Sequence, residues 1–289
     1  MTGPLPAAVA PRAPAAAVGT LLGLLRGPRK LVCGILNVTP DSFSDGGAYW
    51  HSGAAVRRGL RLVEEGADIL DIGGESTRPG SCPPSVAEEL DRVVGVVEQL
   101  AAQTDVPLSI DTSRPEVMRE AVAAGATLIN DVRALRHPGA VEVAAELGVP
   151  VCLSHMLRPP SLMQHDPSYD DVLVEVAAFL RERIDVCLSA GIPREHIVID
   201  PGFGFGKTLE HNLTLLRSLS SFTELGAPVM AGLSRKTMLG QITGRPVGDR
   251  EAASVAAAVL AAQRGAKVLR VHDVAATVDV LRVLDAVEG

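Results

Sequence analysis

Carboxylate, amide and cationic side chains stand at the ends of short apolar runs along this sequence. The stretch IVIDPGFGFGK, residues 197–207, is the clearest case, because three β-branched residues precede Asp200 and glycines follow it. Such a run is typical of a buried parallel strand that ends at the carboxylate and continues into a loop. A carboxylate in this place can bind a planar ligand rich in N–H donors. Phe203 and Phe205 follow at a spacing that can put aromatic surface beside it, and Thr208 is expected to start a helix.

The same stretch has two other interpretations. It nearly matches the phosphate-binding pattern GxxxxGK[ST], but Pro201 replaces the first glycine, which excludes that loop. A surface aspartate followed by a flexible turn stays open from this stretch alone.

Polar residues follow the other short apolar runs as well. One such residue is more often a helix cap than a ligand, but a full set of mixed charge favours a site. The ends are Asn37, Gly73 to Glu75, Asp111, Asn130-Asp131, His155, Asp200, Ser234 to Lys236, and Arg270 with His272. The loops at 37–47 and 75–80 are also rich in polar residues, and we expect them to close over a ligand.

The elements that position these residues follow a repeated pattern. An amphipathic stretch ends in glycine and an apolar run follows, which predicts a helix, its C-terminal cap and a strand. The predicted strands are Leu31–Leu36, Ile69–Ile72, Leu108–Ile110, Leu128–Ile129, Val151–Leu153, Ile197–Ile199, Val229–Ala231 and Val268–Val271. This alternation predicts an α/β fold, a single-domain (β/α)₈ TIM barrel, in preference to an open doubly wound sheet. In such a barrel the active site lies at the C-terminal ends of the strands.

Helix starts support this architecture. Ser85 with Glu88, and Ser113 with Glu116, match the capping-box pattern. The short apolar segment Leu21–Leu25 is expected to plug the floor of the barrel.

Composition excludes several classes of protein. The chain has 289 residues, a net charge of -7 and no basic stretch interleaved with aromatic residues, so nucleic-acid binding is not expected. Residues 1–17 are rich in Ala and Pro and lack the basic start of a secretory signal, so we predict a disordered tail followed by one domain over 18–289. The cysteines form no C-x-x-C pair, which favours reduced, mostly buried thiols in a cytoplasmic protein. The apolar part of Ala16–Leu25 is too short to span a bilayer.

With these pieces in place, the sequence resembles the dihydropteroate synthase family. The matching segments lie in the family's order from about Lys30 to the C-terminus, and together they are highly specific. They are ILNVTPDSFSDGG at 35–47, DIGGESTRPG at 71–80, SIDTSRPEV at 109–117, INDVRAL at 129–135, HM at 155–156, DPGFGFGK at 200–207, GLSRKTMLG at 232–240 and RVHDV at 270–274. The resemblance implies a (β/α)₈ barrel that condenses 6-hydroxymethyl-7,8-dihydropterin pyrophosphate with p-aminobenzoate and releases pyrophosphate.

The resemblance also implies roles for particular residues. The catalytic group is Asp111, Asp200, Lys236 and Arg270. Asp200 holds the guanidine-like edge of the pterin, with Asp111 and Asn130 nearby, and Lys236 meets the acceptors of the ring. Those expected at the pyrophosphate are Asn37, Thr77, Arg270 and His272, and those expected at p-aminobenzoate are Phe43, Arg78, Pro79, Phe205, Lys236 and Thr237. Thr237 stands where the family often has serine, which keeps a hydroxyl but adds a methyl group.

The same resemblance implies Mg²⁺, with Asn37 and Asp45 as candidate ligands, and a homodimer formed through outer helices. Two other functions are compatible with the same scaffold. A pterin-binding methyltransferase domain needs a corrinoid partner, and a non-catalytic paralogue is expected to lose some of Asn37, Asp45, Arg270 and His272, all of which are present.

The sequence leaves two interpretations open for each of three residues. Arg270 is either a phosphate ligand or part of a structural ion pair. His155 is either a site residue or a packed histidine, and Lys207 either orients the Phe205 loop or is solvated.

Overall fold

The computed structural model describes residues 15–39, 48–75, 83–158 and 167–288, with side chains from residue 53 onward in the second of these ranges. Eight parallel strands close into a barrel in sequence order, as the alternation of elements predicts. They are β1 (Leu31–Asn37), β2 (Ile69–Gly73), β3 (Leu108–Asp111), β4 (Leu128–Asp131), β5 (Val151–Ser154), β6 (Ile197–Asp200), β7 (Val229–Ala231) and β8 (Ala266–Val271). Every predicted strand is confirmed, and the β1–β8 pairing excludes the open sheet.

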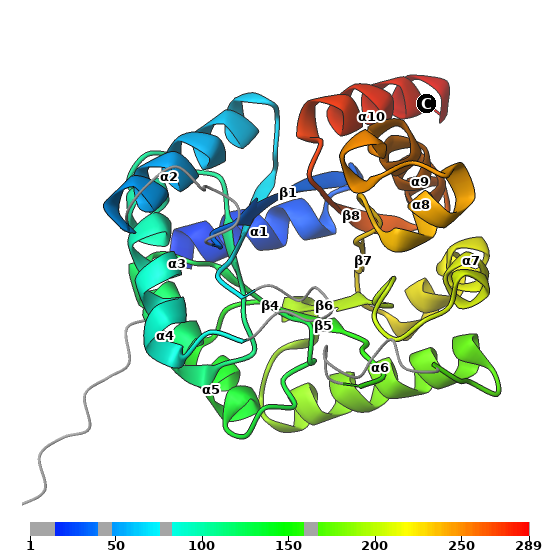
Figure 1. The fold of residues 1–289 in the computed structure, drawn as a ribbon. Coiled ribbons are helices and arrows are strands. Elements are labelled where there is room, and N and C mark those ends of the chain that lie inside the picture. Colours follow the sequence, from blue (N-terminus) through cyan, green and yellow to red (C-terminus); the bar gives the residue numbers. More distant parts are fainter. Residues whose placement is uncertain (1–14, 40–47, 76–82, 159–166, 289) are drawn as a thin grey trace, which may run out of the picture.

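Helices surround the barrel, except for α1, which lies across one end of it (Figure 1). They are α1 (Ala15–Arg26), α2 (Ala48–Glu64), α3 (Val86–Ala101), α4 (Pro115–Ala124), α5 (Ala140–Leu147), α6 (Val172–Ser189), α7 (Leu209–Arg217), α8 (Thr237–Thr243), α9 (Glu251–Gln263) and α10 (Val274–Glu288).

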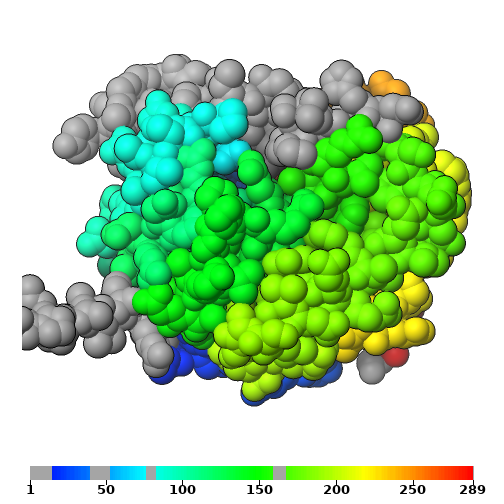
Figure 2. Space-filling model, turned by 90° about the horizontal axis from the view of Figure 1, so that it is seen from below, coloured from blue at the N-terminus to red at the C-terminus, as the bar shows by residue number. Residues whose placement is uncertain are grey.

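The inside of the barrel is apolar at the end where the strands begin. Leu21 and Leu25 of α1 pack there against the first inward side chains of the strands, among them Leu31, Ile69 and Val198. Helix α1 therefore plugs the floor of the barrel, as Leu21–Leu25 predicts. The blue N-terminal segment is visible at the lower edge of the molecule in Figure 2, below the green α5 and yellow-green α6.

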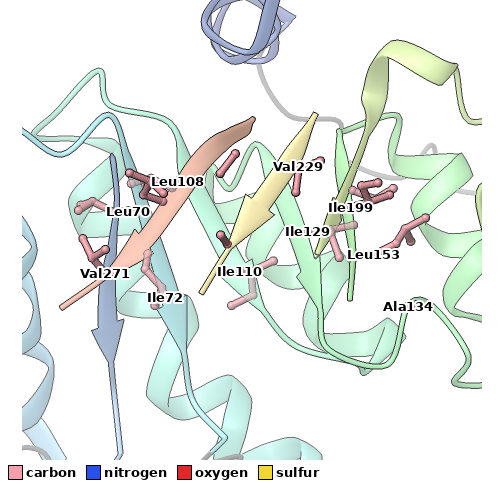
Figure 3. Close-up of a cluster of buried hydrophobic side chains, with 14 of the residues drawn as sticks. Leu70, Ile72, Leu108, Ile110, Ile129, Ala134, Leu153, Ile199, Val229 and Val271 are labelled. Atoms are coloured by element: carbon pink, nitrogen blue, oxygen red, sulfur yellow. The ribbon is translucent and has the colours of Figure 1, made fainter. Parts of the chain in front are cut away.

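The outward side chains of the strands form the larger core with the helices. Figure 3 labels Leu70 and Ile72 of β2, Ile110 of β3 and Ile199 of β6, all of which are fully buried. Because side chains alternate between the two faces of a strand, the outer face of the barrel is apolar while the inner face is free to carry polar groups.

Three local predictions have different outcomes. Ser85 and Glu88 form the predicted capping box at α3. Ser113 and Glu116 do not, because α4 begins one residue later with Arg114 as its N-cap and the Ser113 hydroxyl donates to Asp131 instead. The hydroxyl proton of Ser113 goes to the buried Asp131 carboxylate, which is a strong acceptor because it is charged.

The first helix overlaps the end of the predicted tail, residues 1–17. Helix α1 begins at Ala15, three residues inside the expected tail, because alanine is the strongest helix former and extends the first turn. The preceding residues 1–14 lie outside the described part of the chain. No helix among the described residues is long and apolar enough to cross a bilayer.

Candidate active site

Four strands carry a polar inward side chain two residues after an apolar inward one. Since side chains alternate along a strand, both residues of each pair face the barrel interior, and the polar member lies nearer the C-terminal end. The pairs are Ile69 and Asp71, Leu128 and Asn130, Val198 and Asp200, and Val268 and Arg270. The inside of the barrel is thus apolar at the floor and polar one layer of side chains further on. We call this polar end, where the strands end, the barrel mouth.

Arg270 links two carboxylates across this mouth. Its Nε donates to Asp71 Oδ2 at 2.6 Å and its Nη2 donates to Asp111 Oδ2 at 2.7 Å. Asp71 Oδ2 also accepts a hydrogen bond of 3.0 Å from the Asn130 amide. One guanidinium therefore holds together the ends of β2, β3 and β8, and Asn130 of β4 joins through the shared carboxylate.

Burial and neighbouring charges shift the pKa values of Asp111 and Arg270 in this cluster. Burial raises the pKa of Asp111 to about 7, and the carboxylate of Asp71 adds to that increase while Arg270 opposes it. Burial alone lowers the pKa of Arg270, but the two carboxylates outweigh it and raise that pKa, so the guanidinium stays charged. Asp111 consequently exchanges its proton near neutral pH.

Asp200 ends β6, which is separated from β8 and Arg270 by one strand of the closed barrel. Its side chain is buried, and Oδ1 accepts a hydrogen bond of 2.7 Å from the backbone of Gly202. Burial raises the pKa of Asp200, while that hydrogen bond and the charge of Lys236 lower it. A Cβ at Gly232 would lie 3.8 Å from Asp200 Oδ2 and 3.9 Å from Arg270 Cβ, so the absent side chain leaves space between the two charged groups.

Lys236 and Phe205 meet beside Asp200. The Lys236 ammonium lies 4.0 Å from the centre of the Phe205 ring, a cation–π contact. Burial lowers the pKa of Lys236 to about 8, against the opposing charge of Asp200. Lys236 is therefore mostly protonated at neutral pH, as a donor to ring acceptors must be.

His272 follows β8 and is fixed by Ser234. Its Nδ1 lies 3.0 Å from the Ser234 hydroxyl oxygen, which also accepts from the His272 backbone at 3.2 Å. Burial and the charge of Arg270 lower the pKa of His272 to about 4. The ring is neutral at pH 7 and acts there as a hydrogen-bonding group.

The structure thus brings together Asp111, Asn130, Asp200, Phe205, Lys236, Arg270 and His272 at one end of the barrel, with Asn37 at the end of β1 and Thr237 at the start of α8. The other predicted site residues, Phe43, Asp45, Thr77, Arg78 and Pro79, lie outside the described residues. Phe203 differs from its prediction, because its side chain is fully buried in the core between strands and helices and does not face the site.

Asp71 is the site residue that sequence reasoning missed. It appears only inside the matching segment DIGGESTRPG, yet it accepts from both Arg270 and Asn130. The signal was present, since Asp71 stands two residues after Ile69 just as Asp200 stands two after Val198.

Contacts bear on the three residues that had two interpretations. Arg270 forms ion pairs with two site carboxylates, which does not exclude a phosphate ligand on its other N–H groups. His155 is packed behind the site, and Lys207 is buried and hydrogen-bonded to the backbone of the Phe205 loop.

Comparisons with known proteins agree with this geometry. The family model described as "Pterin binding enzyme" matches residues 33–272. A dihydropteroate synthase of Escherichia coli K12 is 51% identical over 255 residues, covering 88% of this chain and 90% of the relative. The chain belongs to the dihydropteroate synthase family of pterin-binding enzymes.

Solved structures of the family superpose closely on this chain. A Xanthomonas albilineans dihydropteroate synthase with 4-aminobenzoic acid is 59% identical, with a TM-score of 0.86, covering 91% of this chain and 94% of that one. The same organism's enzyme in complex with 7,8-dihydropteroate aligns with a TM-score of 0.83 at 57% identity, covering 91% and 95%. The stretch that the family model matches includes Asn37 and His272, the outermost of the described site residues of this dihydropteroate synthase family member.

Proposed function

We propose that the barrel mouth condenses 6-hydroxymethyl-7,8-dihydropterin pyrophosphate with p-aminobenzoate to give 7,8-dihydropteroate and pyrophosphate. The observation that carries this function is a buried carboxylate, Asp200, with the cation Lys236 near it, at the same end of the barrel where Arg270 pairs with Asp71 and Asp111. The carboxylate suits the N–H donors of the pterin, and the guanidinium suits an anionic leaving group. The chain is a transferase of the dihydropteroate synthase type.

The pterin is expected to bind by its guanidine-like edge. That edge presents several N–H donors in one plane, which a carboxylate matches with paired hydrogen bonds. Asp200 would accept these hydrogen bonds, with Asp111 and Asn130 near the other ring atoms. Lys236 would donate to the carbonyl and nitrogen acceptors of the ring, because it keeps its proton at pH 7.

The pyrophosphate is expected at Arg270, His272 and Asn37, with Thr77 assisting. A guanidinium has five N–H donors, and Asp71 and Asp111 account for two of those on Arg270, so three can serve a phosphate. His272 is neutral and would contribute a hydrogen bond without charge.

The reaction needs positioning more than acid–base catalysis. The arylamine nitrogen forms a bond to the methylene carbon, the carbon–oxygen bond breaks, pyrophosphate takes the electron pair, and the amine releases one proton. The amine is already neutral at pH 7, and the pterin ring can share positive charge on the carbon. The site therefore contributes by holding the two substrates in line and balancing the charge of the leaving group.

On the p-aminobenzoate side we place Phe205 and Lys236, which already lie in contact, together with Thr237. Phe43, Arg78 and Pro79 complete this side of the proposal.

Mg²⁺ belongs to the same proposal, with Asn37 and Asp45 as its protein ligands. No cluster of three His, Cys, Asp or Glu side chains able to hold a metal occurs in the described part of the chain. A sparse protein ligand set fits Mg²⁺, which keeps several waters and binds largely through substrate phosphates. When bound, the ion would neutralise charge on the pyrophosphate. A homodimer through outer helices and a cytoplasmic location are further parts of the proposal that rest on the family.

Two alternatives are less well supported. A methyltransferase domain has no use for a phosphate-binding arginine, and a non-catalytic paralogue would be expected to have lost Arg270 or His272, which this chain retains.

The test is an assay of the purified chain with the pterin pyrophosphate and Mg²⁺. We expect dihydropteroate and pyrophosphate in equal amounts, and only when p-aminobenzoate is added. Pyrophosphate release that does not depend on p-aminobenzoate, or methyl transfer to a corrinoid, would contradict the proposal.

A further inference from the structure

A lysine ammonium is buried directly behind the loop that follows β6. Lys207 is 4% exposed, and its Nζ lies 2.9 Å from the carbonyl oxygen of Gly202, 3.1 Å from that of Phe205 and 2.9 Å from His155 Nδ1. An ammonium has three N–H donors, so every donor has an acceptor. Burial lowers the pKa of Lys207 to about 7, and the hydrogen bonds to three acceptors favour its charged form.

The two carbonyls that Lys207 contacts are the two ends of one turn. The backbone N–H of Phe205 donates to the carbonyl of Gly202 at 3.1 Å, which closes the turn Gly202–Phe205. Lys207 therefore ties both ends to one ammonium. The turn has little other shape available, because a Cβ at Gly202 would lie 1.8 Å from the carbonyl oxygen of His155.

Neighbouring elements hold the same loop from other sides. The Asn212 side chain accepts from the backbone N–H of Gly204 at 2.7 Å and donates to the carbonyl of Lys207 at 3.3 Å. The Tyr169 hydroxyl donates to the carbonyl of Gly206 at 2.9 Å. Lys207 differs from both, because it alone among these three side chains contacts the two ends of the Gly202–Phe205 turn.

His155 provides a neutral acceptor for this ammonium. Its backbone N–H donates to the carbonyl of Asp200 at 2.9 Å, and its ring meets the edge of Phe179 with centroids 4.9 Å apart. Since Nδ1 accepts from Lys207, the proton of the neutral ring is on Nε2. Burial and the charge of Lys207 lower the pKa of His155 to about 2, which agrees with a ring that stays neutral.

The Gly202–Phe205 turn also carries groups that contact active-site residues. The Phe205 ring lies under the Lys236 ammonium, and the Gly202 backbone donates to Asp200. Asp200 has further support from β6, whereas Phe205 depends on the turn for its place.

We propose that Lys207 is a positioning residue for the condensation: by holding both ends of the Gly202–Phe205 turn from behind, it sets the Phe205 ring beside Lys236 where p-aminobenzoate binds. This inference rests on the proposed function. It assigns His155 the role of acceptor for Lys207 and gives neither residue a part in proton transfer with the substrates.

The chain contains a matched control for this lysine. Lys267 of β8 also donates from one ammonium to two backbone carbonyls, those of Gly27 and Arg29, but it does so at the floor of the barrel. Replacing each lysine by methionine removes the ammonium and keeps an unbranched side chain of similar length.

Steady-state kinetics on the full chain separate the two roles. Lys207→Met should raise KM for p-aminobenzoate by at least about 10-fold and change KM for the pterin pyrophosphate by less than about 3-fold, because misplacing one contact surface affects the substrate it touches. Lys267→Met should leave both KM values near those of the wild type. An unchanged KM for p-aminobenzoate in folded Lys207→Met, or an equal rise in both KM values, would overturn the inference.

A second pair of variants covers a Lys207→Met protein that fails to fold. His155→Asn keeps an acceptor oxygen close to the place of Nδ1, and His155→Leu removes the acceptor. We expect KM for p-aminobenzoate to rise in His155→Leu and to recover toward the wild-type value in His155→Asn. Equal values in the two variants would overturn the inference.

Nitrogen NMR of the ¹⁵N-histidine-labelled wild type gives a readout that does not depend on the reaction. His155 should show the Nε2–H tautomer and take up no proton down to pH 5. A protonated ring or the Nδ1–H tautomer would contradict the Lys207 contact. A wild type that makes no dihydropteroate, but shows this tautomer, would count against the proposed function alone.

Discussion

One guanidinium serves two carboxylates at the barrel mouth, and this sharing sets the chemistry of individual residues. Arg270 donates to both Asp71 and Asp111, so a single positive charge is shared between two negative ones. The pKa of Asp111 rises to about 7 and that of Lys236 falls to about 8, both mainly through burial. Both groups are expected at the pterin, and both titrate close to neutral pH. As the pH rises, Asp111 becomes charged and Lys236 becomes neutral.

This balance predicts a narrow pH range for pterin binding. Free hydroxymethylpterin, which lacks the ionising pyrophosphate, should bind best between pH 7 and 8, where Asp111 is ionised and Lys236 is still protonated. Below pH 7 Asp111 gains a proton and becomes a weaker hydrogen-bond acceptor. Above pH 8 Lys236 loses its proton and with it the charge that it presents to the pterin ring. Calorimetric titration from pH 5.5 to 9.5 measures the profile.

Asp71→Asn provides the control for this profile. Removing the neighbouring negative charge should lower the pKa of Asp111 and move the acidic limb to lower pH, while the alkaline limb stays in place. A flat affinity over the whole range, or no movement of the acidic limb in the variant, would contradict the assignment.

At the scale of elements, the site is a product of alternation along short strands. Each of β2, β4, β6 and β8 turns an apolar side chain and then a polar one into the barrel. The polar side chains need no loops to reach one another, because a closed barrel brings the strand ends together. The loop after β6 is the exception, since its course depends on glycines with positive φ and on contacts from behind.

Gly202 offers a test of that loop. In Gly202→Ala the new Cβ would lie 1.8 Å from the His155 carbonyl oxygen at a φ of +72°, so the turn and β5 cannot both keep their places. We expect this variant to lose several times the stability lost by Gly148→Ala, which has a φ of +69° and no atom within 4 Å and should cost about 1 kcal/mol. Urea unfolding measures both, and similar losses would show that the contact with His155 is unimportant.

Sequence reasoning reached the strands and much of the site for a physical reason. Apolar runs that end in Asp111, Asn130, Asp200 or Arg270 are local signals, and barrel closure does the rest. Partners across the barrel leave no such local signal, which is why the Asp71–Arg270 ion pair was missed.

The packing of some individual side chains could not be predicted from the sequence either. Phe203 and Phe205 are two residues apart in one loop, yet the first is in the core and the second is at the site, because Gly204 between them has a positive φ and turns the chain. Ser113 fitted a capping pattern but bonds to Asp131 on the next strand, and a pattern confined to one helix cannot reveal that acceptor.

For the molecule as a whole, stability and chemistry are placed at opposite ends of the barrel. Helix α1 closes the floor with Leu21 and Leu25, while the charged groups gather where the strands end. Mutations at the floor should therefore change stability without changing the reaction.

Leu21→Ala tests this separation. Leu21 is fully buried against the inner side chains of the strands, so the cavity should cost about 3–5 kcal/mol of unfolding free energy. Leu24→Ala, at a half-buried position of the same helix, should cost much less. Both variants should retain the wild-type kcat at a temperature where they are folded, and a large fall in kcat of folded Leu21→Ala would show that the two ends are coupled.

The central claim is that the Asp200 carboxylate holds the pterin, and calorimetric titration of Asp200→Asn with the pterin pyrophosphate tests it most directly. The substitution keeps the size of the side chain but places amide donors opposite the pterin donors and removes a charge from a buried site. Breaking a buried charged pair typically costs about 3–5 kcal/mol, which corresponds to a loss of affinity of at least about 100-fold. The account predicts this loss in a protein that still unfolds cooperatively, and wild-type affinity in folded Asp200→Asn would contradict it.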